Sequence, residues 1–227
     1  MSGPLAFVGG AEWQEGCTFD ADLLAASGGT EVVLLPTADA YEHPEVLIES
    51  ATTWFDGLGA TVRSLDVLRR PDALVEEHVE AVRNARFLYL SGDSPMHLRS
   101  VVKDTPLWDA VVEAWQGGAV LAASAGAARL MGDPMVDPRG GAFTLGMGLV
   151  TNLAVIPHHD KWTGDRAHRT LRLSPTGVVV AGIDERTALI RAADGTWSTA
   201  GAGDVAVFVD GKPADLSALS EGVTAPA

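Results

Sequence analysis

The chain of 227 residues is long enough for one substantial hydrophobic core, because area scaling predicts that a protein of this size buries about 70% of the surface of its unfolded chain. Hydrophobic residues make up 47% and charged residues 20%, a composition that excludes intrinsic disorder. With 16 basic and 30 acidic side chains, the formal net charge is −14. A chain this acidic would repel phosphate groups, so we expect no nucleic-acid partner and no anionic-membrane partner.

Four short apolar runs in the first part of the chain have the pattern of strands that are buried on both faces. Glycine or proline lies close to an end of each run. The runs are Leu5–Val8, Glu31–Leu35, Phe87–Leu90 and Ala119–Ala122.

Longer segments between these runs have the apolar spacing of amphipathic helices. They are Pro44–Leu58, Pro71–Ala85, and the segment that opens at Thr105-Pro106 and closes at Gly117-Gly118. Strands and helices that alternate in this way predict an α/β fold, with a mostly parallel sheet flanked by helices on both faces.

The last third of the chain holds closely spaced strand candidates with the turn signals Asp194-Gly195 and Asp210-Gly211 between them. The candidates are Val178–Val180, Thr187–Ile190, Trp197 and Val205–Val209. We expect them to be antiparallel strands added to the edge of the sheet. In the absence of a linker or repeat, residues 1–216 predict a single domain, followed by a loose tail over 217–227.

Cysteine usage and the first residues bear on the cellular compartment. Cys17 is the single cysteine, which excludes an internal disulfide and a multi-cysteine zinc site and favours a reducing compartment. Met1–Pro4 has no basic segment followed by an apolar one, and the apolar runs are too short for a membrane span. We expect a cytoplasmic protein with no membrane partner.

Ser124 stands where an apolar strand ends and a helix-forming run begins. The segment resembles the nucleophile elbow G-x-S-x-G, with Ala122 at the first glycine position and Gly126 at the second. Small neighbours are needed there because the backbone of the nucleophile is strained, and the following helix would favour negative charge near its N-terminus. The alternative is a tight turn in which Ser124 only caps the helix.

A nucleophilic serine needs a base, and histidine is the first candidate. Four of the six histidines fall in helical patterns: His43, His78, His97 and His168. His158 and His159 instead follow the buried-type run Leu153–Pro157, and at most one of them can readily face Ser124 because adjacent residues of an extended chain point to opposite faces. A metal site made by this pair with Asp160 is the alternative, although consecutive histidines lack the spacing of a helical zinc site.

The base requires an acid that orients it. The apolar run that begins at Val178 ends in Asp184 and Glu185, and either carboxylate could serve or could be a solvated turn residue. The resulting order Ser–His–acid differs from the Ser–acid–His order of α/β-hydrolases and argues against that fold.

An ordered set of motifs from about residue 5 to 210 resembles the serine peptidases that include cyanophycinase and aspartyl dipeptidase (peptidase E). The motifs are Phe7–Glu12, Ala26–Gly29, Leu35–Ala38, Leu90–Ser94, Ser124–Ala127, Pro157-His158 and Gly182–Leu189. The resemblance implies a class I glutamine amidotransferase-like fold. It also implies that Ser124 is the nucleophile, His158 the general base and Glu185 the orienting acid.

The same resemblance implies an oxyanion hole made by the backbone N–H groups of Gly92 and Ala125. This agrees with the physical chemistry, because a glycine after a buried strand lets the backbone approach an oxyanion closely. The chain departs from the family at this turn, which usually reads Gly-Gly-Asp-Gln or Gly-Gly-Asn-Thr and here reads Ser91–Ser94. The arginines after the histidine are also spaced differently, so the resemblance supports catalysis but not cyanophycin or Asp-X dipeptides as the substrate.

Substrate binding is predicted for residues near the turn and after the histidine: Asp93, Ser94, Lys161, Arg166 and Arg169. The segment His158–Leu173 carries four basic and two acidic side chains in an otherwise acidic chain. We therefore expect it to bind a small anionic group or the C-terminal carboxylate of a peptide.

The sequence predicts a serine peptidase that hydrolyses a dipeptide or short peptide through a Ser–His–Glu triad and an acyl-enzyme intermediate. Two alternatives stay open: an inactive small-molecule-binding protein of the same fold, and an esterase that uses the same serine. Glutaminase chemistry would need a cysteine at the elbow, and Cys17 is far from it in sequence. We expect no cofactor and no metal, and a homodimer is left open.

Overall fold

The computed structural model of the protein describes residues 2–139 and 141–224. Its strands are β1 (Leu5–Val8), β2 (Glu31–Leu35), β3 (Thr61–Ser64), β4 (Phe87–Leu90), β5 (Val120–Ser124), β6 (Gly132–Asp133), β7 (Met135–Val136), β8 (Phe143–Thr144), β9 (Val150–Thr151), β10 (Leu153–Pro157), β11 (Val179–Ile183), β12 (Thr187–Arg191), β13 (Trp197–Gly201), β14 (Val205–Val209) and β15 (Lys212–Ala214). Its α-helices are α1 (Phe19–Ser27), α2 (Pro44–Gly57), α3 (Glu76–Arg83), α4 (Pro95–Val102), α5 (Pro106–Gln116), α6 (Ala125–Met131), α7 (Gly164–Arg172) and α8 (Ser217–Gly222). Short 3₁₀ helices cover Thr37–Asp39, Arg70–Leu74 and His159–Lys161.

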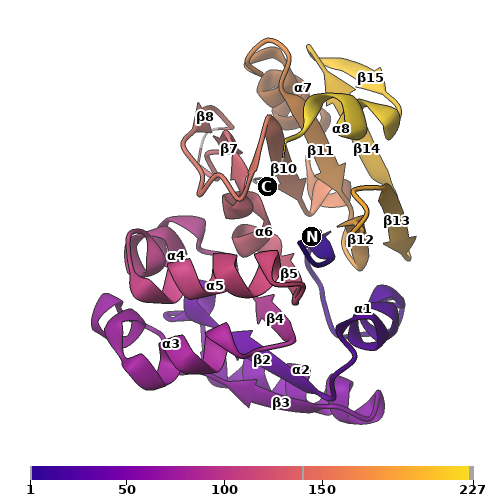
Figure 1. The fold of residues 1–227 in the computed structure, drawn as a ribbon. Coiled ribbons are helices and arrows are strands. Elements are labelled where there is room, and N and C mark those ends of the chain that lie inside the picture. The colour runs from indigo at the N-terminus through magenta and orange to yellow at the C-terminus, as the bar shows by residue number, and fades with distance from the viewer. Residues whose placement is uncertain (1, 140, 225–227) are drawn as a thin grey trace.

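A seven-stranded sheet in the order β13-β12-β1-β5-β4-β2-β3 forms the centre of the fold (Figure 1). Each neighbouring pair among β1, β5, β4, β2 and β3 is parallel. β12 pairs with β1 in antiparallel orientation, and β13 pairs with β12 in the same way. The predicted α/β class with a mostly parallel sheet is confirmed.

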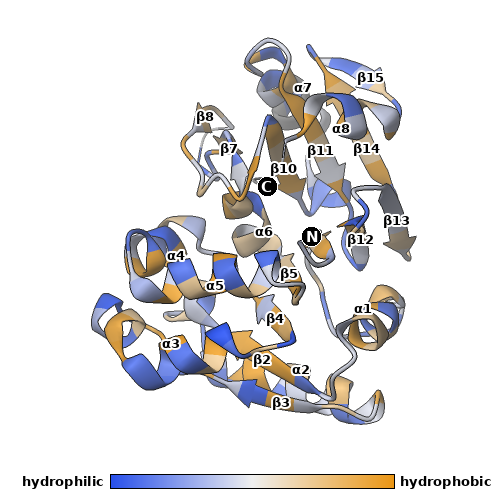
Figure 2. Cartoon of the chain, in the orientation of Figure 1, coloured by the Kyte–Doolittle hydropathy of each residue, from blue (hydrophilic) through white to orange (hydrophobic). Residues whose placement is uncertain are grey.

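Helices cover both faces of this sheet (Figure 1). Leu98 of α4 and Trp115 of α5 lie in a buried cluster on one face, and Phe19 of α1 and Phe55 of α2 lie in the cluster on the other. In Figure 2 strand β2 is coloured apolar, whereas α3 and α5 alternate between apolar and polar residues. Burial of both sheet faces explains why the strands read as continuous apolar runs.

The last third of the chain differs from the sequence-based expectation. β12 and β13 do extend the edge of the main sheet, but β10, β11, β14 and β15 form a separate four-stranded sheet in which β10 and β11 are parallel. The prediction that Val178–Val180 and Val205–Val209 add to the main sheet is therefore wrong. These runs have strand pattern, but the pattern of a run does not identify the strand with which it pairs.

Two local expectations also need correction. The predicted helix Pro71–Ala85 is interrupted, because Val75 has an extended backbone (φ −75°, ψ 120°) between a 3₁₀ helix and α3. The predicted loose tail is ordered over residues 217–224, where α8 buries Leu219 completely and Thr224 pairs with Thr151. The final residues, 225–227, lie outside the described part.

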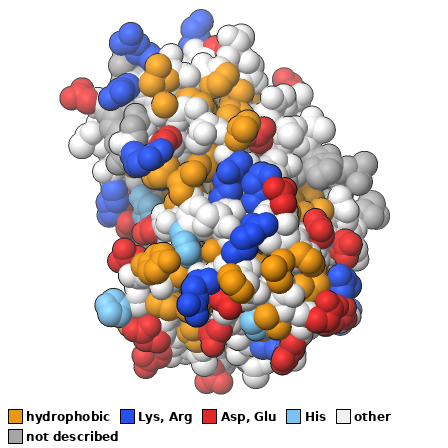
Figure 3. Space-filling model, turned by 90° about the vertical axis from the view of Figure 1, so that its left-hand side faces the viewer, with side chains coloured by type: hydrophobic (Ala, Val, Ile, Leu, Met, Phe, Trp, Pro, Cys, Tyr) orange, Lys and Arg blue, Asp and Glu red, His pale blue; other side chains and the backbone are white. Residues whose placement is uncertain are grey.

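Among the described residues, every helix is too short or too polar to span a lipid bilayer. The described side chains on the face in Figure 3 carry charges of both signs, and acidic side chains are most numerous along its lower part. Charges of both signs therefore lie close together among the described residues of this face.

Candidate active site

The register of the main sheet brings several strand ends to one edge. Ser124, the last residue of β5, pairs with Val8, the last residue of β1, and its neighbour Ala123 pairs with Leu90, the last residue of β4. The carboxyl ends of parallel strands meet at the same edge, where open α/β sheets bind their ligands. The loops after β1, β4 and β5 therefore surround Ser124.

Ser124 is completely buried and lies directly before α6. Its own backbone is extended (φ −115°, ψ 150°), and the strained residue is Ala125, with φ of 54°. The sequence predicted backbone strain at Ser124, and this prediction is wrong. The strain lies at the next residue, Ala125. Although Ser124 occupies the N-cap position of α6, its side chain makes no capping hydrogen bond, and its hydroxyl donates to Glu12 Oε2 at 2.6 Å.

His158 and Glu185 meet because β10 and β11 are parallel and in register, with Pro157 opposite Ile183. The histidine follows β10 directly and Glu185 follows β11 by two residues. His158 Nδ1 lies 3.1 Å from Glu185 Oε1. A contact of this kind can orient a catalytic imidazole.

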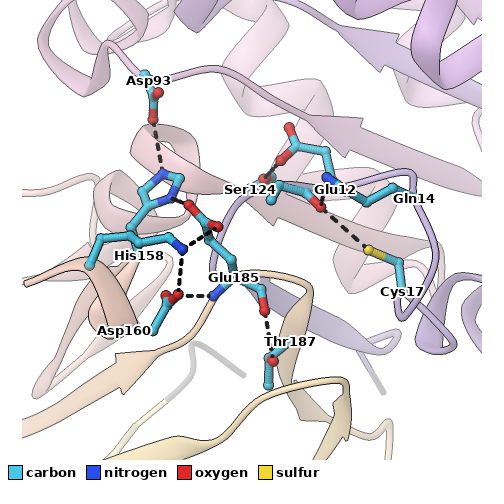
Figure 4. Close-up of polar contacts among 11 residues, drawn as sticks. Glu12, Gln14, Cys17, Asp93, Ser124, His158, Asp160, Glu185 and Thr187 are labelled. Atoms are coloured by element: carbon cyan, nitrogen blue, oxygen red, sulfur yellow. Dashed lines mark hydrogen bonds and ion pairs between the residues drawn. The ribbon is translucent and has the colours of Figure 1, made fainter.

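The other ring nitrogen of His158 lies 3.4 Å from Asp93 Oδ1. This contact, with a further contribution from Glu185, raises the pKa of His158, although partial burial opposes the shift. The same contact lowers the pKa of Asp93. In the part of the chain that the structure describes, neither nitrogen of His158 bonds to Ser124, because the serine faces Glu12 while His158 lies between Asp93 and Glu185 (Figure 4).

Gly10 and Gly126 let the loops approach these groups closely. A Cβ on Gly10, whose φ is +105°, would lie 2.1 Å from Cε1 of His158. A Cβ on Gly126 would lie 2.4 Å from the carbonyl oxygen of Asp93. Glycine is thus required both beneath the imidazole and where the 91–94 turn packs on the start of α6.

The two residues predicted to form the oxyanion hole lie on adjoining strand ends. Gly92 follows β4 with φ of +120°, and Ala125 follows β5. The Gly92 carbonyl accepts a hydrogen bond from Ala127 N–H (3.1 Å), which fixes the turn to α6. Asp39 Oδ1 accepts the N–H of Asp93 (2.8 Å) and anchors the other side of the turn.

The predicted substrate-binding residues divide between two places. Asp93 and Ser94 line a hollow of about 570 Å³ beside the turn, whose other lining residues are Asp39, Glu42, Pro95, Met96, Pro138 and Arg139. Lys161 pairs with Asp160 (3.2 Å) and with Glu185 (3.3 Å), so its charge lies beside the histidine–glutamate pair. Arg169 is an exposed residue of α7, and the side chain of Arg166 lies outside the described part.

His159 and Asp184 form a second pair beside the first, with His159 Nδ1 3.6 Å from Asp184 Oδ1. The His159 ring also lies near Phe208, with a centroid distance of 6.2 Å. Because the two adjacent histidines face different carboxylates, they do not converge on a common point. Within residues 2–139 and 141–224, no group of His, Cys, Asp and Glu side chains has the arrangement of a metal site.

Glu12 is a site residue to which the sequence assigned no role. It accepts hydrogen bonds from the hydroxyls of both Ser124 and Ser91. The sequence indicated Glu12 only as the last residue of the motif Phe7–Glu12. The strand register was needed to show which side chains it contacts.

Comparison with known proteins identifies the family of the chain. The model of peptidase family S51 matches residues 8–197. The chain belongs to peptidase family S51. It is therefore a serine-type peptidase.

Curated relatives of this S51 peptidase include a cyanophycinase from Synechococcus elongatus, 26% identical over 225 residues, which cover 92% of this chain and 68% of the relative. A cyanophycinase from Geminocystis herdmanii is 24% identical and covers 82% of this chain and 72% of the relative. A crystal structure of a peptidase from an acI-B1 Actinobacterium aligns with a TM-score of 0.82 and 31% identity over 92% of each chain. A putative peptidase E from Listeria monocytogenes EGD-e shares the fold, with a TM-score of 0.65 and 14% identity over 92% of this chain and 99% of that one.

Proposed function

We propose that this peptidase hydrolyses a dipeptide or short peptide through an acyl-enzyme on Ser124, with His158 as the general base and Glu185 as its orienting acid. The observation that carries the proposal is the 3.1 Å contact between His158 Nδ1 and Glu185 Oε1, at the same edge of the fold as the buried Ser124. An imidazole held in this way can take a proton at Nε2 and later return it.

The proposed reaction is acyl transfer to water. Ser124 Oγ attacks the amide carbonyl, its proton passes to His158, and the N–H groups of Gly92 and Ala125 stabilise the oxyanion. His158 then protonates the departing amine, and water hydrolyses the ester of Ser124.

The hollow beside the 91–94 turn supports a small substrate. Asp39, Glu42 and Asp93 offer carboxylates to the ammonium group of a short peptide. Arg139 lines the same hollow, but its guanidinium already pairs with Asp137 (2.8 Å). The basic residues after His158, Lys161, Arg166 and Arg169, remain our proposed site for a substrate carboxylate. Because the Ser91–Ser94 turn and the arginine spacing depart from the family pattern, we do not propose cyanophycin as the substrate.

A fluorophosphonate probe tests the nucleophile directly. We expect the wild-type protein to be labelled and Ser124→Ala not to be, and undiminished labelling of the variant would refute the assignment. Absence of labelling in the wild type would favour a binding protein without turnover. Parallel assays with p-nitrophenyl esters and a peptide library, with Ser124→Ala as the control, separate an esterase from a peptidase.

A further inference from the structure

The Glu12 carboxylate joins the nucleophile to the turn that precedes the oxyanion hole. Its Oε2 accepts the Ser124 hydroxyl at 2.6 Å, and its Oε1 accepts the hydroxyl of Ser91. Both serines are completely buried, so neither hydroxyl can turn to bulk water. Hydrogen bonds to an ionised acceptor are about twice as strong as those between neutral groups.

The loop that carries Glu12 also holds the backbone of the histidine and of the residue after Glu185. The Gly9 carbonyl accepts the N–H of His158 (2.7 Å), and the Gly10 carbonyl accepts the N–H of Arg186 (2.8 Å). The neighbours of Glu12 in the chain, Ala11 and Trp13, have φ of 49° and 59°, a conformation that is strained for residues other than glycine. The fold thus maintains strain on both sides of Glu12, and it does so at the active site.

A serine hydroxyl carries one hydrogen, and in this arrangement Glu12 accepts it. The two nitrogens of His158 meanwhile contact Glu185 and Asp93. The bond between Ser124 and Glu12 must therefore break before His158 can take the proton. An interaction made in the ground state and lost in the transition state slows the chemical step.

The negative charge of Glu12 also slows the chemical step. Because Glu12 contacts Ser91, its carboxylate lies beside the Gly92 turn at which the oxyanion would form. A second negative charge at this place raises the energy of the oxyanion. Both effects predict that removal of the Glu12 charge makes Ser124 more reactive.

We propose that Glu12 is a positioning residue that holds Ser124 in a resting arrangement, and that attack begins only when the serine exchanges Glu12 for His158. The inference rests on the proposed function of Ser124 and His158. In the exchange, the Oγ–H bond breaks and the proton passes to His158 Nε2. The electron pair of Oγ forms the bond to the carbonyl carbon, and the carbonyl π pair moves to the oxygen.

The test compares second-order labelling rates with a fluorophosphonate for the wild type, Glu12→Gln and Glu15→Gln. Glu15 lies three residues further along the chain and is exposed, so Glu15→Gln makes the same chemical change outside the site. We expect Glu12→Gln to raise the rate about tenfold, as loss of a hydrogen bond to a charged acceptor allows, and Glu15→Gln to leave it unchanged. A merely structural role for Glu12 would lower the rate, so a lower or unchanged rate overturns the proposal.

A second variant covers the case in which Glu12→Gln does not fold. Glu12→Ala removes both the charge and the acceptor of the Ser124 hydroxyl, and we expect faster labelling here as well. Labelling of Ser124→Ala or His158→Ala at the wild-type rate would refute the proposed function itself. Loss of labelling in those two variants, without a gain in either Glu12 variant, would refute only the role of Glu12.

Discussion

His158 Nε2 lies 3.4 Å from Asp93 Oδ1, so a carboxylate contacts the nitrogen that receives the Ser124 proton in the mechanism we propose. This contact is the largest cause of the raised pKa of His158, and Glu185 adds to it at the other nitrogen. Two carboxylates on one imidazole favour its protonated form, which cannot act as a base.

Asp93→Asn should move the pH dependence of the peptidase toward acid. Activity that needs neutral His158 rises as the pH increases through its pKa, and without the Asp93 charge this pKa falls. We therefore expect the acid limb of kcat/KM to begin at lower pH in the variant. The measurement is the midpoint of the limb, which is independent of any loss in maximal rate. Asp109→Asn, an exposed change on α5, should leave the midpoint in place. An unchanged midpoint in Asp93→Asn would show that Asp93 does not control the proton affinity of His158.

Strands β1, β2, β4 and β5 of the main sheet were predictable because burial on both faces leaves a purely local signal, as in Leu5–Val8 and Glu31–Leu35. Strand β3 (Thr61–Ser64) was not predicted, because its residues alternate between exposed and half-buried and form no apolar run. Ser124 and His158 also stood out as candidates, since Ser124 ends such a run and His158 follows one directly. The contact between Ser124 and Glu12 was not, because it joins residues 112 positions apart and depends on the pairing of β1 with β5. Local patterns give no register between distant strands.

For the same reason, the residue pattern could not decide whether Asp184 or Glu185 contacts His158. Both carboxylates follow β11, and only the packing of β10 against it directs Glu185 to His158 and Asp184 to His159. The Asp93 contact was missed because it crosses from the main sheet to the second sheet, whose existence the sequence did not predict.

Gly10→Ala should disable the enzyme through His158. The added Cβ would lie 2.1 Å from Cε1 of the ring, and φ of +105° is strained for any residue with a side chain. We expect kcat/KM to fall by about 100-fold or more, because a displacement of about 1 Å at a catalytic group has an effect of this size.

Gly28→Ala is the matched control for Gly10→Ala. Gly28 also has a positive φ, +61°, but a Cβ there would meet no atom closer than 4.0 Å. We expect this variant to lose stability in thermal unfolding and to keep its kcat/KM. A similar loss of kcat/KM in both variants would mean that backbone strain, and not the contact with His158, causes the effect.

Asp20→Asn should stabilise the protein increasingly as the pH rises. Asp20 is completely buried, and burial raises its pKa to about 8, opposed by the hydrogen bond from Trp54 Nε1 (3.0 Å). An unfolded aspartate titrates near pH 4, so between about pH 4 and 8 the folded state binds the extra proton and stability falls with rising pH, by up to about 1.4 kcal/mol per pH unit.

The asparagine variant lacks this dependence and can still accept the Trp54 hydrogen bond. Denaturant unfolding at pH 5 and pH 8 should therefore show a larger advantage over the wild type at pH 8. Asp22→Asn, exposed on the same helix, should give the same difference at both pH values. If the advantage of Asp20→Asn were independent of pH, Asp20 would be ionised in the folded protein across this range.

Glu185→Gln should lower kcat and leave KM nearly unchanged. Glu185 Oε1 lies 3.1 Å from His158 Nδ1, and its charge stabilises the imidazolium that forms during proton transfer. A glutamine fills the same space but carries no charge and can present a donor to the nitrogen, so we expect kcat to fall about 10²- to 10⁴-fold. Asp184→Asn is the control, because Asp184 makes the equivalent ion pair with His159 and also accepts the N–H of Asp204. We expect this variant to keep kcat within about threefold, the range of a change outside the reacting groups. Equal losses of kcat in the two variants, or a loss confined to KM in Glu185→Gln, would mean that Glu185 does not orient the base, and that the 3.1 Å contact is only structural.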